Sequence, residues 1–422
     1  MRSEWPRKHL AEISEVITGF PFKGEKYLPP KHGVRVVRGD NVTERYLRWG
    51  EKEKCWSGVT ADLKPYVLRS GDVVIGMDGS KVGKNFAAIS PDDEGSLLAQ
   101  RVARLRAREG ISQDYLRYVI CNDSFTEYVK AVHTGTSIPH ISKGQIENFE
   151  VVVPPFEDQQ QIAAVLISLD DRITLLRETN ATLEAIAQAL FKSWFVDFDP
   201  VRAKMEGRTP EGMDEATAAL FPDGFETSEL GEVPRGWRVG QVADLGDVVC
   251  GKTPPTSAPE NYGGDVPFIT IPDMHDLLAV TTTARSLSKL GADSQPKKYL
   301  PPGAICVSCI ATPGLVVRVT TTAQTNQQIN SVIPHRKWGS SFPLFLLRRI
   351  GDAVRSGGSG GSVFHNLSKS GFEQLPVLLT EPELADRFNA VIDPLVEKIV
   401  ANQLQAQTLS TLRDTLLPRL IS

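Results

Sequence analysis

Two short stretches have residue spacings that could support phosphate or metal chemistry. The segment GSKVGKN, residues 79–85, is similar to a phosphate-binding loop, but three residues separate its glycines, and Asn85 stands where Ser or Thr should hold magnesium. The segment CVSC, residues 306–309, has metal-ligand spacing, yet no second Cys or His pair at suitable spacing accompanies it. In a strand, two cysteines three residues apart point to opposite faces. We therefore predict a turn at 79–85 and a structural strand at 306–309.

Other signatures of catalysis are missing from the sequence. The glycine-rich run GGSGGS, residues 357–362, does not have the spacing of a dinucleotide-binding loop and is typical of a flexible loop near a phosphate backbone, or of a linker. The chain has no Asp/Asn-Pro-Pro-aromatic tetrapeptide of the kind that methyltransferases use to hold a target adenine. We predict no catalytic, cofactor-binding or metal-binding residues.

Charge is distributed unevenly along the chain, whose net charge is −4. Residues 1–155 contain 23 Lys and Arg against 20 Asp and Glu, and residues 236–379 contain 13 against 9. Residues 156–235 contain 7 against 16, and residues 380–422 contain 4 against 6. The order basic, acidic, basic, acidic is compatible with nucleic-acid binding by the two basic blocks, although ordinary surface variation also explains an excess of this size.

The two basic blocks also repeat each other in sequence. LAEISEVITG, residues 10–19, aligns with VADLGDVVCG, residues 242–251, at eight of ten positions as identities or close substitutions. GTSIPHISKGQIENFEVVVP (135–154) aligns with GGSVFHNLSKSGFEQLPVLL (360–379). The chain is therefore predicted to be a tandem duplication of a mixed domain followed by an acidic helix.

The acidic blocks have the 3.5-residue hydrophobic period of a coiled coil. Apolar positions begin at Ile162 in the first block and at Phe388 in the second, and each series contains one Asn. The predicted seam residues are Ile162, Leu166, Leu169, Ile173, Leu176, Asn180, Leu183, Leu190, Phe388, Ile392, Leu395, Ile399, Asn402, Leu409 and Leu416. We expect the two helices to pair antiparallel, and Asn180 and Asn402 either fix the register or lie at the edge of the stripe.

Length and composition indicate an ordinary globular protein with more than one core. A chain of 422 residues with 41% hydrophobic and 23% charged residues predicts two or three domains. The N-terminal sequence MRSEWPRKHL has no apolar run, no segment reaches the length of a membrane span, and five scattered cysteines do not form a disulfide framework. These features predict a cytoplasmic protein in a reducing compartment.

A DNA-binding geometry follows from this organisation. A helix over residues 157–195 is about 55–60 Å long at ~1.5 Å per residue. Two basic domains joined by two such helices would lie far apart and face the same way, and one turn of B-DNA is roughly 34 Å. The spacing suits two half-sites that are separated by about a turn or more.

Several segments give the sequence a clear family resemblance. These are residues 157–207 (EDQQQIAAVLISLDDRITLLRETNATLEAIAQALFKSWFVDFDPVRAKMEG), LFPDGF (220–225), SELGEVPRGW (228–237) and LSTLRDTLLPRL (409–420). In this order they resemble the specificity (S) subunits of type I restriction-modification systems, and the resemblance covers nearly the whole chain.

The resemblance implies a fold, partners and cofactors. It implies an α+β fold, a tandem pseudo-twofold repeat of two mixed α/β target recognition domains separated by two long helices that form an antiparallel coiled coil. Each recognition domain reads half of a gapped target in double-stranded DNA, and two methyltransferase (M) subunits dock on the helices, with restriction (R) subunits completing the nuclease. S-adenosylmethionine belongs to M, and ATP with magnesium belongs to R, so the S subunit itself has no catalytic activity and no cofactor.

The expected segments are a first recognition domain (1–155), a first spacer helix (156–198), a linker (199–236), a second recognition domain (237–379) and a second spacer helix (380–422). The aromatic stretch FKSWFVDF, residues 191–198, either docks the M subunit or packs against the adjacent recognition domain.

Residue type and the internal repeat together indicate candidate DNA contacts. Polar positions present in both copies are expected to serve the framework or to contact phosphates, and positions that differ between the copies are expected to read bases. The phosphate-side candidates are Ser137, His140, Lys143, Ser362, His365 and Lys369, for which a shared turn is the alternative. The base-reading candidates are Lys23, Arg38, Asp40, Asn41, Lys81, Lys84 and Arg101 in the first domain, and Lys252, Thr253, Asp273, Thr312, Asn326, Gln327 and Gln328 in the second.

Three other functions remain open from the sequence. An enzyme with a hidden active site is disfavoured by the missing motifs. A coiled-coil scaffold without a DNA role predicts no salt-dependent binding of duplex DNA by the two basic domains. The third is a coiled-coil adaptor that directs a different DNA-modifying or defence enzyme to DNA, which gene neighbours would distinguish.

Overall fold

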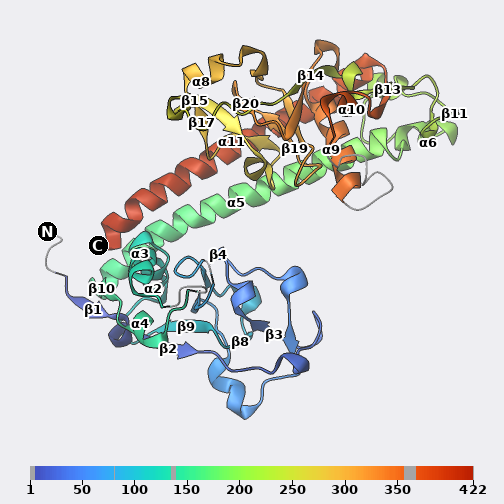
Figure 1. Ribbon diagram of the computed structural model, residues 1–422. Coiled ribbons are helices and arrows are strands. Elements are labelled where there is room, and N and C mark those ends of the chain that lie inside the picture. The colour runs from blue at the N-terminus through green and yellow to red at the C-terminus, as the bar shows by residue number, and fades with distance from the viewer. Residues whose placement is uncertain (1–4, 80, 135–138, 356–366, 422) are drawn as a thin grey trace. The chain divides into compact units, whose positions relative to one another are not determined.

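A computed structural model describes residues 5–79, 81–134, 139–355 and 367–421. The chain divides into two compact units, one formed by residues 1–173 with 408–422 and the other by residues 174–407. Each unit contains one mixed domain together with a part of each of the two long helices (Figure 1).

In the described part of the first unit the strands form three small sheets. A five-stranded sheet has the order β2-β9-β6-β7-β4, a three-stranded sheet has the order β5-β3-β8, and β1 pairs with β10. The strands are β1 (Arg7–His9), β2 (Ser14–Thr18), β3 (Val34–Val37), β4 (Glu44–Arg45), β5 (Cys55–Trp56), β6 (Val73–Gly76), β7 (Phe86–Ala88), β8 (Leu97–Leu98), β9 (Val102–Ala107) and β10 (Glu150–Val152).

The second unit repeats this arrangement strand by strand. Its five-stranded sheet has the order β14-β21-β18-β19-β16, its three-stranded sheet has the order β17-β15-β20, and β13 pairs with β22. The strands are β13 (Arg238–Gln241), β14 (Gly246–Cys250), β15 (Tyr262–Ile269), β16 (Ala279–Val280), β17 (Ser286–Leu287), β18 (Ile305–Ser308), β19 (Val316–Val319), β20 (Gln324–Thr325), β21 (Ile329–Pro334) and β22 (Pro376–Leu379). The predicted tandem duplication is confirmed, since each of the strands β1–β10 has a counterpart at the same place among these strands of the second unit.

Short helices cover the five-stranded sheets. In the first unit they are α1 (Leu10–Ile13), α2 (Gln113–Ile120), α3 (Asp123–Val132) and α4 (Lys143–Glu147), and in the second they are α9 (Ser341–Arg355) and α10 (Lys369–Glu373). The helix α8 (Lys289–Asp293) packs instead against the three-stranded sheet, where Ala292 joins Phe268 and Leu287 in a small core. The helices α4 and α10 begin alike, because the hydroxyl oxygens of Ser142 and Ser368 accept a hydrogen bond from the third residue that follows.

Two long helices, α5 (Phe156–Phe195) and α11 (Pro382–Ile421), each run without interruption for 40 residues. In the first unit, Arg413 Nη1 lies 2.6 Å from Asp170 Oδ1. In the second unit, Asn180 bonds Asn402, and the Phe191 and Phe388 rings are 5.7 Å apart. Residue numbers fall along α11 as they rise along α5, so the predicted antiparallel pairing is confirmed (Figure 1).

The predicted seam is buried to different degrees along the pair. Eight of its residues are nearly inaccessible, with exposures of 0–8%: Ile162, Leu166, Ile173, Leu176, Phe388, Ile392, Ile399 and Asn402. Ala187, beside them on α5, is fully buried. The remaining members are half-buried, namely Leu169, Asn180, Leu183, Leu190, Leu395, Leu409 and Leu416. Near the end of α11 the packing residues are Leu417 and Ile421, which join the core of the first unit with Leu166. The seam thus shifts by one position from Leu416, where the sequence period was already irregular.

An amide pair lies within the seam of the second unit. Asn402 is 1% exposed, and its Nδ2 donates to Asn180 Oδ1 at 2.8 Å. Asn180 Nδ2 in turn donates to the Ile399 carbonyl oxygen at 3.1 Å. A hydrogen bond that requires both amides opposite each other favours one register over others, which is the role that the sequence left open.

Replacing one member of this pair is expected to cost more than replacing both. Asn180→Leu removes the acceptor of the buried Asn402 amide, which should lower the free energy of unfolding by about 1–3 kcal/mol. In Asn180→Leu/Asn402→Leu two leucines pack in the seam, and most of this loss should be recovered. Urea denaturation of the wild type, both single variants and the double variant gives the coupling energy. Additive losses in the double variant would contradict the pairing.

The aromatic end of α5 packs inside the second unit. Phe191, Trp194 and Phe195 are 3–7% exposed and belong to the same hydrophobic core as Trp237 and Phe388. Of the two interpretations of FKSWFVDF, packing against the adjacent domain accounts for these three side chains.

Residues 199–236 contain regular structure although the sequence suggested a linker. They form α6 (Asp199–Met205), α7 (Glu215–Ala219) and a hairpin of β11 (Phe225–Ser228) and β12 (Gly231–Pro234). Val201 and Phe221 are 0% and 2% exposed and join the core of the second unit. Most of the Pro, Gly and acidic residues that indicate a linker lie between these short elements or at their ends.

Over the described ranges, the structure has no helix that is both long enough and apolar enough to cross a membrane.

Candidate nucleic-acid interface

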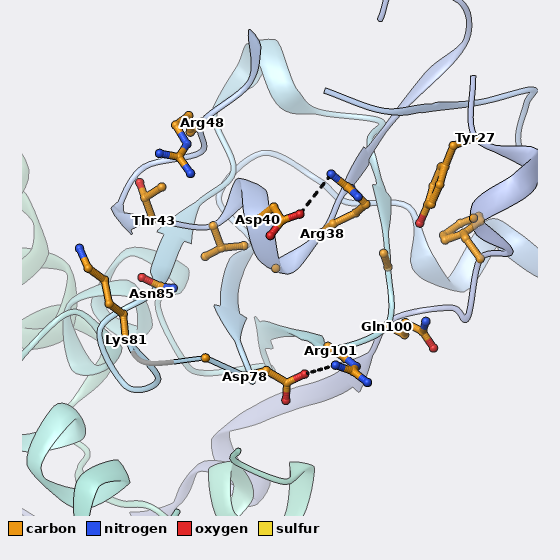
Figure 2. Close-up of a pocket in the computed structure, with 16 residues that line it drawn as sticks. Tyr27, Arg38, Asp40, Thr43, Arg48, Asp78, Lys81, Asn85, Gln100 and Arg101 are labelled. Atoms are coloured by element: carbon orange, nitrogen blue, oxygen red, sulfur yellow. Dashed lines mark ion pairs between the residues drawn. The ribbon is translucent and has the colours of Figure 1, made fainter. Parts of the chain in front are cut away.

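A polar cleft of about 770 Å³ lies in the first unit and is lined by the segments that connect its strands. Figure 2 shows that its lining includes four cations, Arg38, Arg48, Lys81 and Arg101. Asp40 and Asp78 are the carboxylates among its lining residues, and Thr43, Asn85 and Gln100 add neutral hydrogen-bonding groups. Excess positive charge with mixed donors and acceptors suits a phosphate backbone and base edges together.

Arg38 is held at the side of this cleft by several groups. Its Nη2 lies 3.5 Å from Asp40 Oδ2 and donates to the Lys52 carbonyl oxygen at 3.1 Å. Its guanidinium carbon is 5.6 Å from the centre of the Tyr27 ring. The side chain is therefore pre-oriented, which lowers the entropy lost when a ligand is bound.

Arg101 projects further into solvent than Arg38. Its side chain is 71% exposed, and its Nη1 lies 3.1 Å from Asp78 Oδ2 (Figure 2). The other carboxylate oxygen of Asp78 bonds His140 Nδ1. The backbone of Arg101 is left-handed, with φ of 66°. Because Asp78 contacts only one edge of the Arg101 guanidinium, the other edges are available to a ligand.

The structure brings four of the seven base-reading candidates of the first domain into this cleft, namely Arg38, Asp40, Lys81 and Arg101. Lys23 and Lys84 are exposed but do not line it. Asn41 is fully buried, and its amide bonds only backbone groups: it accepts from Arg38 N at 3.1 Å and donates to the Arg48 and Lys52 carbonyls.

Asp273 has the same structural role in the second unit. Asn41 ends the short helix η2 (Gly39–Asn41) after β3, and Asp273 lies in η8 (Ile271–Met274) after β15. Asp273 Oδ2 accepts from Thr270 N at 2.8 Å, the counterpart of the bond from Arg38 N to Asn41. Because both side chains hold the same turn, we leave Asn41 and Asp273 out of the DNA interface.

Five other candidates gather at the equivalent edge of the second unit. Asn326 Nδ2 donates to Gln328 Oε1 at 3.0 Å, and Thr253 Oγ1 donates to Gln327 Oε1 at 2.6 Å. Lys252 precedes Thr253 and is exposed. The edge of the second unit is therefore dominated by amides where the first unit has arginines.

The last second-domain candidate, Thr312, lies elsewhere. Its carbonyl oxygen accepts from Ser308 Oγ at 2.6 Å, and the residue lines a separate hollow with Glu184 and Arg348. This position separates Thr312 from the amide-rich edge.

Of the phosphate-side candidates, which both copies share, the structure describes three: His140, Lys143 and Lys369. Lys143 Nζ lies 3.5 Å from Glu147 Oε1, and Lys369 Nζ lies 3.3 Å from Glu373 Oε1. These matching pairs on α4 and α10 favour a framework role over phosphate contact. His140 bonds Asp78 beside the cleft, and Ser137, Ser362 and His365 lie outside the described residues.

The segments at 79–85 and 306–309, whose spacings resemble a phosphate loop and a metal site, have roles in the fold. Residues 81–84 form a turn that leads into β7, with Lys84 N donating to the Lys81 carbonyl at 2.9 Å. Cys306 and Cys309 lie in different hydrophobic cores. Within the ranges that the structure describes, no cluster of three or more His, Cys, Asp or Glu residues is placed to hold a metal ion.

Burial suppresses the reactivity of these thiols. It raises the pKa of Cys306 to about 12 and that of Cys309 to about 11, and it raises the pKa of Cys121 to about 11 as well. Cys55 is also buried, whereas Cys250 is partly exposed. Since the thiolate is the nucleophile, a pKa of 11 leaves about one thiolate per thousand thiols at pH 8.

Alkylation should therefore discriminate among the cysteines. At pH 8 the folded chain is expected to take up iodoacetamide rapidly at Cys250 and at least tenfold more slowly at the other four cysteines. Peptide mass spectrometry against time checks the order, and Cys250→Ser should abolish the rapid phase. Rapid labelling of Cys306 or Cys309 would contradict the assigned burial.

Sequence reasoning missed Arg48, Thr43, Asp78, Asn85 and Gln100 among the cleft residues. Arg48 and Thr43 lie in a stretch where the repeat is weak, so no pairing with the second half marks them. Gln100 and Asp78 stand next to repeated strands, and their position before β9 and after β6 was an available signal.

Comparison with known proteins places these features in context. The family model for the type I restriction modification DNA specificity domain matches residues 2–185 and 234–400. The type I restriction enzyme HindI specificity subunit of Haemophilus influenzae is 38% identical over 354 residues, covering 73% of this chain and 76% of the relative. The MjaIX specificity subunit of Methanocaldococcus jannaschii is 26% identical over 440 residues, covering 99% and 93%.

A solved structure shares the fold. The S subunit of a type I restriction-modification system from M. genitalium has a TM-score of 0.60 at 14% identity, with 99% of this chain and 96% of that chain covered. The duplicated architecture is therefore found in another chain of similar extent.

Proposed function

Because the chain belongs to the family of type I restriction modification DNA specificity proteins, we propose that it is the DNA-recognition subunit of a type I restriction-modification complex. Each recognition domain reads one half of a gapped, bipartite target in double-stranded DNA. The two long helices set the distance between the halves and provide the docking surface for two M subunits. R subunits join these components in the complete nuclease.

The proposal divides the chain at the boundaries that the sequence suggested. Residues 1–155 and 237–379 are the recognition domains, residues 156–198 and 380–422 are the spacer helices, and residues 199–236 connect the two halves. These boundaries are supported by the positions of α5 and α11, which begin at Phe156 and Pro382.

The observation that supports DNA recognition most directly is the polar cleft of the first unit. Arginine and lysine line it beside neutral donors and acceptors, and four of its residues are base-reading candidates of the sequence. The equivalent edge of the second unit has a different set of polar side chains on the same backbone framework. Two recognition domains that read different half-sites need the same backbone framework but different polar side chains to contact the bases.

The chemistry of the complex belongs to its other subunits in this proposal. The M subunits methylate adenine with S-adenosylmethionine, and the R subunits hydrolyse ATP in the presence of magnesium. This chain binds neither cofactor and supplies sequence choice alone. It acts where chromosomal and incoming DNA are accessible, which places it in the cytoplasm.

Binding of duplex DNA tests the proposal and identifies the role of the cleft. Affinity should fall steeply as salt rises, because phosphate contacts release counterions. Arg48→Ala should weaken binding to every duplex several-fold and reduce the slope of log K against log salt by about 0.9. Fluorescence anisotropy at a series of salt concentrations measures both.

The matched control is Arg69→Ala, which removes an exposed arginine that does not line the cleft. Equal slopes for wild type and Arg48→Ala would exclude the cleft as a phosphate site. Salt-independent binding by the wild type would favour a scaffold without a DNA role.

A further inference from the structure

Two residues at equivalent backbone positions differ in chemistry between the units. Arg101 immediately precedes β9, and Gln328 immediately precedes β21. The Arg101 carbonyl accepts from Met77 N at 2.9 Å, just after β6, and the Gln328 carbonyl accepts from Cys309 N at 3.0 Å, just after β18. Because β6 and β18 are counterparts, these bonds make Arg101 and Gln328 structural equivalents.

The neighbours of the two residues differ as well. Arg101 is oriented by the Asp78 carboxylate at 3.1 Å, and Asp78 is itself held by His140. The residue after Cys309, at the place of Asp78, is Ile310, which is half-buried and apolar. Gln328 is oriented by an amide instead, since its Oε1 accepts from Asn326 Nδ2 and its backbone N–H donates to Asn326 Oδ1.

Both side chains retain unused hydrogen-bonding capacity after these contacts. One ion pair occupies one edge of the Arg101 guanidinium, which has five N–H donors. Gln328 has a second lone pair on Oε1 and two amide hydrogens. The contact with Asp78 orients Arg101, and the contact with Asn326 orients Gln328. Each contact leaves other donors or acceptors of the side chain available for a base.

The chemistry of these faces matches different bases. A guanidinium donates two parallel hydrogen bonds to guanine O6 and N7, whereas a glutamine amide accepts from adenine N6 and donates to N7. We propose that positions 101 and 328 are a pair of equivalent specificity positions, at which Arg101 selects guanine in one half of the DNA target and Gln328 selects adenine in the other. Asp78 is the positioning residue for Arg101. This inference rests on the proposed function.

Selection from a pool of random-sequence duplexes by the full chain tests the assignment. The wild type should enrich a gapped motif with guanine at one position of one half and adenine at one position of the other. Arg101→Gln should exchange that guanine for adenine, lowering the preference for guanine by about 5–150-fold. Gln328→Arg should make the reverse change in the other half, and Arg69→Gln should leave both halves unchanged.

Asp78→Asn tests the positioning role separately. The variant should still prefer guanine, but with a preference reduced by about tenfold, while the salt dependence of binding to non-specific duplex keeps its slope. A structural defect in the domain would lower the preference at every position of that half and would also change the slope. The unaltered half of the motif serves as an internal control for folding in each variant.

The possible outcomes distinguish a failure of the assignment of positions 101 and 328 from a failure of the proposed function. If the wild type selects a gapped motif and Arg101→Gln selects the same one, the assignment of position 101 is overturned and the proposed function stands. If Arg101→Gln changes both halves, the equivalence is overturned. If the wild type selects no sequence, the proposed function fails and the inference fails with it.

Discussion

A chain in which residues 1–155 are replaced by a second copy of residues 237–379 is expected to recognise an inverted repeat of its second half-site. The strand order of the two units is the same, and both units include parts of the same antiparallel helices. A recognition domain should therefore fit either position without altering the spacing between the half-sites. The half-site read by residues 1–155 is lost in this exchange.

The size of the effect follows from the cost of mismatched base pairs. Each mismatch costs about 1–3 kcal/mol, so a change at two or more base pairs lowers affinity for the original target by about a hundredfold or more. Sequencing the methylated target of the exchanged chain with its M partner measures the new motif. The reciprocal exchange should double the first half-site, and a change in the gap or in the retained half would refute the modular organisation.

Phe388→Ala is expected to lower the free energy of unfolding of the second unit by about 3–5 kcal/mol. Phe388 is fully buried on α11, and its ring lies 5.2 Å from Phe195 and 5.7 Å from Phe191 on α5. It also contacts the Phe345 ring on α9 at 6.2 Å. One truncation therefore leaves a cavity where both long helices and the second domain meet.

Urea denaturation of the full chain measures this loss as an earlier transition. Val391→Ala on the same helix is the matched control, because Val391 is 50% exposed and its truncation should change stability by less than about 0.5 kcal/mol. Equal effects of the two variants would show that α11 is not anchored through Phe388.

The duplication and the helix pair were predictable because they depend on regular patterns. Repeated sequence predicts repeated topology, and a 3.5-residue period predicts a paired seam whatever the surrounding loops do. The end of α11 shows the limit of such patterns, since its period becomes irregular near Arg413. This residue bonds the Asp170 and Asp414 carboxylates, which raise its pKa although burial alone would lower it.

The candidate site was predictable only in part. Asn41 and Asp273 are polar residues in loops, and nothing in their type reveals that they bond backbone groups inside a turn. Arg48 lies in a poorly repeated loop, and its place in the cleft depends on tertiary structure. Sequence therefore identifies the kind of residue that binds DNA, whereas the folded chain decides which of them share a surface.

The most direct test of the account is single-molecule sequencing of adenine methylation in a host without other methylation. The host expresses this chain together with its M partner, and a second culture expresses the M partner alone. We predict a gapped, asymmetric methylated motif that appears only when this chain is present. Methylation of the same sites by the M partner alone, or an ungapped motif, would contradict the proposal that this chain selects a bipartite DNA target.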